Sequence, residues 1–337
     1  MVTWLALFFA LSVAGTWLAR RYALQRRLLD EPGERRSHAI ATPRGGGIAI
    51  AASVLVAAVA LAARFPGQRL LLGAFAIGLA LVATIGWLDD HRPLSPWWRL
   101  LAHVAAAGVF AAALVVSGAG VGAGVFALAA IVVLTNVWNF MDGINGLATS
   151  QAAIVGGSLA FVANGIWAAV GWALVAACVG FLPFNFPRAR IFLGDVGSGA
   201  LGFVVAALLS VAWTSVQSTP QAPVSAASLL LFLPLAPFLI DAGLTLLRRV
   251  ARGERWWMPH TQHAYQVWAR RKGHGVVTVA YGITSAAAIA LAVWAWGGSL
   301  VHVSIALGAW YTAGALLWRW LQHGSTDGTE QVQRAKE

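Results

Sequence analysis

Long apolar runs alternate with short polar segments along the whole chain. Most runs approach the roughly 20 residues that an α-helix needs to cross a bilayer. The pattern therefore predicts an all-α, polytopic integral membrane protein with about eleven transmembrane helices. The expected helices cover residues 2–22, 47–63, 70–88, 100–117, 121–138, 147–163, 166–183, 199–216, 226–247, 276–296 and 300–320. We expect a single transmembrane domain over residues 1–322, followed by a polar, disordered tail over residues 323–337.

One stretch, Thr135 to Leu147, interrupts this pattern with amides, a carboxylate and two glycines. Backbone left unpaired in hydrocarbon costs several kcal/mol per group, so this stretch must line water, protein or a ligand. We interpret it as the rim of an active site.

Four oxygen-bearing side chains recur at every third position of this stretch: Asn136, Asn139, Asp142 and Asn145. If a helix persists through them, the spacing places all four along one stripe. Amide and carboxylate oxygens suit a hard cation such as Mg²⁺, and amides can also read the edge of a nucleobase. The alternative is a hydrogen-bonded seam between helices.

Two adjacent carboxylates, Asp89 and Asp90, stand at the end of the helix expected over 70–88. They repel one another, and the dipole at a helix C-terminus disfavours negative charge. We therefore expect a metal ion or a basic side chain beside them. The alternative is a solvated helix end.

Two glycine-containing segments are suited to binding phosphate. Arg44 precedes Gly45–Gly47 at the start of a helix, where backbone amides can bind an anion, although a solvated connector has the same composition. Asp195 lies in Gly194-Asp195-Val196-Gly197-Ser198, which sets a carboxylate beside backbone that a phosphate can approach closely. A plain turn is the alternative for this second segment.

A pair of histidines, His260 and His263, shares one face of the last polar segment. A zinc site would need a third ligand, of which the sequence shows no sign. Hydrogen bonding to phosphate or sugar is therefore the favoured interpretation.

The basic residues indicate the orientation of the helices. If the N-terminus is extracytoplasmic, 21 of the 23 Lys and Arg lie on or beside the cytoplasmic side, and only Arg64 and Arg69 fall on the other side. This asymmetry follows the positive-inside rule and places the polar clusters at the cytoplasmic face. The net charge of +11 does not indicate nucleic acid, because the basic residues are spread over loops beside membrane helices. Anionic membrane lipids are their expected partners.

Five motifs, taken in order, resemble the polyprenyl-phosphate N-acetylhexosamine-1-phosphate transferases, the WecA-like group that also includes MraY. The motifs are Arg36-Ser37-His38 to Gly47, Asp89-Asp90 with Arg99, Asn136 to Leu147, Phe192 to Ser198, and His260 to Gln266. The resemblance implies transfer of a sugar 1-phosphate from a UDP-N-acetylhexosamine to a polyprenyl phosphate such as undecaprenyl phosphate, with release of UMP. It also implies a bacterial inner-membrane location, a requirement for Mg²⁺ that Mn²⁺ could meet, and it is compatible with a homodimer.

The resemblance assigns roles to individual side chains. The implied metal ligands are Asn139 and Asp195, the substrate-binding residues are Arg44, Arg99, Asn136, Asn145, His260 and His263, and the catalytic carboxylates are Asp89, Asp90 and Asp142. A phosphate monoester is largely ionised at pH 7, so a dedicated base is not required. One member of the acidic pair is therefore expected to orient the acceptor or to take up a residual proton.

Asn145 departs from the family pattern, because many bacterial members have Asp at this position. The hydrogen-bonding amide remains while the charge is lost, which bears on nucleobase preference more than on activity. The final motif resembles the branch that initiates O-antigen synthesis, which implies a small amino sugar.

The alternative function is a transporter or lipid flippase, which would also use intramembrane acids and broken helices. The gathering of all polar clusters at one face disfavours that alternative.

Overall fold

The computed structural model describes residues 1–31, 40–217, 224–255, 257–258 and 260–323. The motif residues Arg36, Ser37 and His38, and the expected tail from residue 324 onward, lie outside the described residues. The helices are α1 Val2–Arg26, α2 Ile48–Arg64, α3 Arg69–His91, α4 Pro96–Leu114, α5 Val121–Phe140, α6 Leu147–Ala163, α7 Gly165–Asn185, α8 Gly194–Gln217, α9 Val224–Leu230, α10 Ala236–Ala251, α11 Ala264–Lys272, α12 His274–Ala295 and α13 Leu300–His323, with short turns η1 Pro66–Gln68 and η2 Val115–Ala119. Strands β1 Leu29–Asp30 and β2 Thr42–Pro43 form a small antiparallel pair. The all-α prediction is confirmed.

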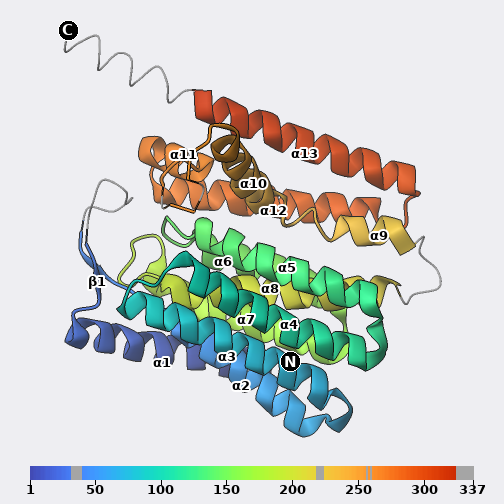
Figure 1. Cartoon of the computed structure of the whole chain (residues 1–337), viewed down its shortest axis with the longest axis horizontal. Helices are drawn as coiled ribbons and strands as arrows, with labels where there is room; N and C mark the ends of the chain where they lie inside the picture. The colour runs from blue at the N-terminus through green and yellow to red at the C-terminus, as the bar shows by residue number, and fades with distance from the viewer. Residues whose placement is uncertain (32–39, 218–223, 256, 259, 324–337) are drawn as a thin grey trace.

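Helix α8 lies at the centre of the bundle and packs against α3, α5 and α6 (Figure 1). Most of its residues are buried. Small residues allow helices to approach closely, and a Cβ atom at Gly202 would overlap the backbone of Leu134 and Thr135 on α5. The start of α8 is therefore held in a fixed position relative to its neighbours.

Eight of the described helices are long and apolar enough to cross a membrane. Helices α2 and α6 are apolar but shorter. The total of eleven membrane spans stays a prediction.

The expected continuous helix over 226–247 is wrong. Helix α9 ends at Leu230 and α10 begins at Ala236. Pro234 and Pro237 lie at this break, and proline interrupts a helix because it lacks an N–H donor and its ring clashes with the preceding turn. Helix α11 was not expected, because its nine residues form a short and polar segment. Helices α9 to α13 lie along one side of the α1–α8 bundle (Figure 1).

Candidate active site

Polar side chains from four helices meet where α3 and α5 end and where α4 and α8 begin. Asp89 and Asp90 lie in the last turn of α3, and Asn139 lies in the last turn of α5. Arg99 lies in the first turns of α4, and Asp195 lies in the first turn of α8. The structure thus brings together residues that the sequence analysis selected from three separate motifs.

Arg99 bridges two carboxylates of this group. Its Nη1 donates to Asp89 Oδ2 at 3.0 Å and to Asp195 Oδ2 at 3.3 Å. The other oxygen of Asp89 accepts from the backbone N–H of Leu94 at 2.6 Å. The expectation of a basic side chain beside the acidic pair is confirmed.

Asn139 holds the second oxygen of Asp195. Its Nδ2 donates to Asp195 Oδ1 at 2.6 Å and to Ser198 Oγ at 3.0 Å. Both oxygens of the Asp195 carboxylate therefore have a donor, one from α5 and one from α4, and these contacts fix the direction in which the carboxylate points.

Asp90 is buried, with 2% of its surface exposed, and it binds the start of α8. Its Oδ1 accepts from the backbone N–H of Asp195 at 3.1 Å, and its Oδ2 accepts from the N–H of Val196 at 3.1 Å. The first N–H groups of a helix have no partner within that helix, so Asp90 supplies one. Gly194 precedes them with φ +76°, and a Cβ there would overlap the Asp90 carboxylate, so only glycine fits. This geometry couples Asp90 to the position of Asp195.

Arg44 reinforces the same contact. Its guanidinium group donates to the carbonyl oxygen of Asp90, and its Nε lies 4.0 Å from Asp90 Oδ1. The N–H groups of Gly46 and Gly47 donate to the carbonyls of Phe192 and Leu193 at 2.9 and 2.8 Å. Two of the three glycine amides considered for an anion are therefore already paired with the segment before α8.

The expected stripe of four side chains does not form, because α5 ends at Phe140. Asn136 and Asn139 stay on the helix, whereas Asp142 and Asn145 lie in the loop before α6. Asp142 is half-buried; burial, and then the charges of Asp195 and Asp90, raise the pKa of its carboxyl well above the usual range. It therefore belongs electrostatically to the acid cluster.

Asn185, which the sequence analysis did not select, fixes the loop before α6. Its Oδ1 accepts from the N–H of Gly146 at 2.7 Å, and its Nδ2 donates to the carbonyl of Ile191 at 3.0 Å. Asn145 donates from Nδ2 to the carbonyl of Pro187 at 3.0 Å. A polar amide at the end of the apolar helix α7 was the signal that could have identified Asn185.

A cavity of about 290 Å³ opens beside the cluster. Arg99, Asn139 and Asp195 line its polar end, and Asn136 also faces it while donating to the carbonyl of Val132 at 2.7 Å. The remaining walls are mainly apolar and include Ile85, Trp97, Leu100, Val132, Val133, Leu246 and Trp257. The cavity therefore joins an apolar passage to a charged end.

The two predicted histidines lie beside Phe140, at the end of α5. The rings of His260 and His263 stack at 4.9 Å, and the His263 ring lies 6.2 Å from that of Phe140. His263 is buried and caps α11. Burial, and then the neighbouring charges of His263 and Arg249, lower the pKa of His260 to about 4. His260 is therefore neutral near pH 7 and can donate or accept a hydrogen bond there.

Comparison with known proteins decides the family of the chain. The family described as "Glycosyl transferase family 4" matches residues 72–213, which contain the Asp89–Arg99–Asn139–Asp195 cluster. A decaprenyl-phosphate N-acetylglucosaminephosphotransferase of Mycolicibacterium smegmatis is 30% identical over 292 residues, covering 74% of this chain and 70% of the relative. The chain belongs to glycosyl transferase family 4.

Two further relatives carry names of phospho-sugar transferases. An undecaprenyl-phosphate alpha-N-acetylglucosaminyl 1-phosphate transferase of Yersinia pestis is 28% identical over 291 residues, covering 79% of this chain and 76% of the relative. A phospho-N-acetylmuramoyl-pentapeptide-transferase of Synechococcus is 31% identical over 232 residues, covering 59% and 67%. The family match confirms the resemblance inferred from the motifs. With eight candidate membrane spans and bacterial relatives, this family 4 protein is a bacterial multi-pass membrane protein.

The acid cluster has the donor set that Mg²⁺ prefers. Mg²⁺ is usually held by one or two carboxylates together with substrate phosphates, and not by a cage made of protein alone. Asp89 and Asp195 converge on one cation, the Arg99 guanidinium, at the cavity. Among the described residues, no group of three or more His, Cys, Asp or Glu side chains could hold a metal ion. A metal at this place would have two protein carboxylates as ligands and would take the remaining oxygens from substrate phosphates. Asn139 would join as an oxygen ligand only after its amide turns over, since its nitrogen now faces Asp195.

Proposed function

We propose that this family 4 protein transfers an N-acetylhexosamine 1-phosphate from a UDP-sugar to a polyprenyl phosphate, releasing UMP, with Mg²⁺ as its cofactor. One observation carries the proposal: a mainly apolar cavity ends at Arg99, Asn139 and Asp195, and the Arg99 guanidinium also holds the Asp89 carboxylate. The names of the relatives support it, because they pair a polyprenyl phosphate with an amino-sugar phosphate. None of these names supports the transporter alternative.

The cavity suits the acceptor lipid. Its apolar walls, which include Leu100, Val132 and Val133, would contact the prenyl chain, and its polar end would receive the phosphate. Arg99 carries a permanent positive charge whose planar group suits phosphate oxygens. A lipid phosphate at this position would lie beside Asp89 and Asp195.

The reaction needs positioning and charge neutralisation more than a protein nucleophile. An ionised oxygen of the acceptor phosphate attacks the β-phosphorus of the UDP-sugar. The bond from that phosphorus to the bridging oxygen breaks, and UMP leaves with the oxygen and its charge. A bound Mg²⁺, held by Asp195 and Asn139, would supply neutralisation of the phosphate oxygens. Arg99 orients the acceptor phosphate, and Asp89 holds Arg99 or takes up a residual proton.

The donor would lie next to the acceptor phosphate, toward the loop before α6 and the histidine pair. Asn145 would face the uracil ring, and Asp142 and neutral His260 would hydrogen-bond the sugar or the diphosphate. We further propose that this end of the bundle faces the cytoplasm, since the basic loops gather there by the positive-inside rule.

UMP release from the purified protein tests the proposal. The protein receives undecaprenyl phosphate, Mg²⁺ and, one at a time, UDP-GlcNAc, UDP-GalNAc and UDP-MurNAc-pentapeptide. We expect UMP that depends on the lipid, on Mg²⁺ and on one amino-sugar donor. Asp195→Ala should lower the rate by about a thousandfold or more, whereas Ser210→Ala, on the same helix about four turns away, should not change it. Folded protein that releases no UMP, or that releases it without lipid, would contradict the proposal.

A further inference from the structure

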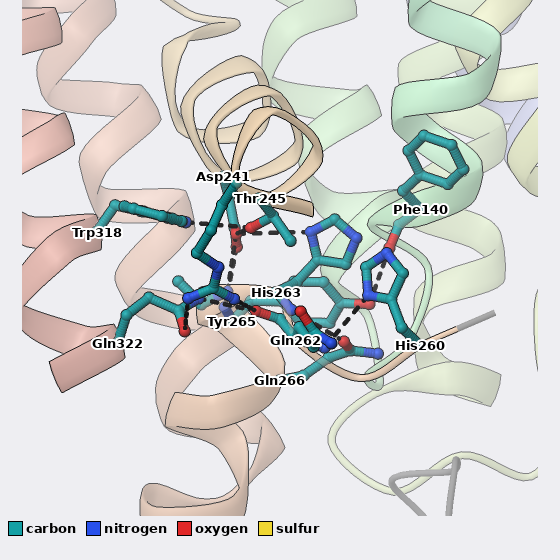
Figure 2. Close-up of polar contacts among 12 residues, drawn as sticks. Phe140, Asp241, Thr245, His260, Gln262, His263, Tyr265, Gln266, Trp318 and Gln322 are labelled. Atoms are coloured by element: carbon teal, nitrogen blue, oxygen red, sulfur yellow. Dashed lines mark hydrogen bonds and ion pairs between the residues drawn. The ribbon is translucent and has the colours of Figure 1, made fainter. Parts of the chain in front are cut away.

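Asp241 on α10 is buried, with 2% of its surface exposed, and it lies outside the acid cluster. Its Oδ1 accepts from the N–H of Ala264 at 2.8 Å and from Thr245 Oγ1 at 3.2 Å. Its Oδ2 accepts from the N–H of Tyr265 at 2.9 Å and from the hydroxyl of Tyr281 at 2.8 Å. One carboxylate therefore ties α10 to the first turn of α11 and, through Tyr281, to α12. Figure 2 shows Asp241 beside Tyr265 and Thr245.

Two side chains of the α11 terminus continue this connection to α5. The hydroxyl of Tyr265 donates to the carbonyl of Phe140 at 3.0 Å, and the ring of His263 lies nearly parallel to the Phe140 ring, at 25° (Figure 2). A Cβ at Gly143 would overlap the Tyr265 hydroxyl, so the loop before α6 packs against this contact without a gap. Phe140 directly follows Asn139, whose amide holds Asp195. A continuous set of contacts therefore runs from Asp241 to the acid cluster.

We propose that Asp241 is a positioning residue of the active site and acts through Tyr265. It holds the segment with His260 and His263 against the end of α5, so that these histidines keep a fixed position relative to Asn139 and Asp195. The inference rests on the proposed function, and Asp241 itself touches no reacting atom.

The contacts require a carboxylate at this position. Every hydrogen-bonding partner of Asp241 is a donor, and a buried acceptor is stable only when such donors are present. An asparagine offers a single carbonyl oxygen, so Asp241→Asn leaves either Ala264 or Tyr265 with an N–H facing an amide NH₂ group. The first turn of α11 would then detach from α10.

Steady-state kinetics separate positioning from a purely structural role. Tyr265→Phe removes only the hydrogen bond to Phe140 and leaves every Asp241 contact in place. Tyr311→Phe is the matched control, because Tyr311 donates to the carbonyl of Phe232 at the same 3.0 Å, on α13. We expect Asp241→Asn and Tyr265→Phe to raise KM for the UDP-sugar about tenfold, with KM for undecaprenyl phosphate within about twofold of wild type. Tyr311→Phe should leave both constants unchanged. A loss confined to kcat with unchanged donor KM, or an equal effect in Tyr311→Phe, would overturn the inference.

Backbone hydrogen exchange tests the coupling without substrates and so separates it from the proposed reaction. Amides of residues 139–147 should exchange faster in Asp241→Asn and in Tyr265→Phe than in wild type and Tyr311→Phe. Unchanged exchange there in both variants would overturn the inference. If exchange is faster in the two variants but the wild-type protein releases no UMP, the proposed function is contradicted and the coupling is not.

Discussion

Asp90→Asn distinguishes a residue that positions the site from one that transfers a proton. Both oxygens of Asp90 accept backbone N–H groups at the start of α8, each at 3.1 Å, and Asp195 supplies one of these groups. Asparagine is similar in shape but keeps only one acceptor oxygen. The substitution therefore changes the direction in which the Asp195 carboxylate points, and it leaves no cavity at residue 90.

The size of the effect follows from these bonds. A hydrogen bond to a charged acceptor contributes roughly 1.5–3 kcal/mol, and Asp90→Asn removes one such bond. A loss of about 2 kcal/mol corresponds to about 30-fold in rate when it acts through the placement of Asp195. The amide NH₂ group facing the second N–H adds repulsion, so we expect kcat to fall between about 10-fold and 100-fold. This loss is well short of that expected for Asp195→Ala.

The assay is UMP release as a function of pH, with detergent-solubilised variants of matched thermal midpoint. A positioning role predicts the same fractional loss at every pH and an unchanged profile shape. Gly194→Ala should give a similar defect, because its Cβ would press on the same carboxylate. Disappearance of the acidic limb of the profile in Asp90→Asn, or a loss as large as that of Asp195→Ala, would refute the positioning role.

Three further changes have defined outcomes. Gly143→Ala introduces a Cβ that would overlap the Tyr265 hydroxyl, so KM for the UDP-sugar should rise about tenfold; unchanged kinetic constants would contradict this packing. His260 has a pKa of about 4 in the folded protein and about 6.5 when unfolded, so the unfolded state takes up the proton first as pH falls from 6.5 to 4. The free energy of unfolding should therefore decrease in that window. Between pH 7 and pH 5, the thermal midpoint of His260→Gln should fall by less than that of wild type, and equal falls would exclude His260 as a cause. Arg99→Ala leaves Asp89 and Asp195 without their shared cation, so kcat/KM should fall by about 100-fold or more, and wild-type kinetics would remove Arg99 from the site.

The acid cluster was predictable because its signals are local. Apolar runs identify the helices, and polar residues at their ends stand out against membrane-spanning segments. The repulsion between Asp89 and Asp90 required a nearby cation, and Arg99 and Arg44 supply it. Asp195 was found from its glycine neighbours alone.

The supporting contacts were not predictable, because they depend on packing between distant segments. Asn185 lies 39 residues from Gly146, whose N–H it accepts, and Tyr265 lies 125 residues from Phe140. Asp241 lies within the apolar run expected over 226–247, and its role depends on α11, which no apolar run indicated. The break between α9 and α10 was missed because mean hydropathy stays high across prolines that interrupt the helix.

Transfer of a doubly labelled donor tests the central claim most directly. The purified protein receives undecaprenyl phosphate and UDP-N-acetylglucosamine that carries ³²P at the β-phosphate and ¹⁴C in the sugar, and the lipid is extracted and counted. We predict that both labels enter the lipid in equal amounts, while the released nucleotide is unlabelled UMP. Sugar label in the lipid without ³²P, accompanied by labelled UDP, would show transfer of the sugar alone and would contradict the account.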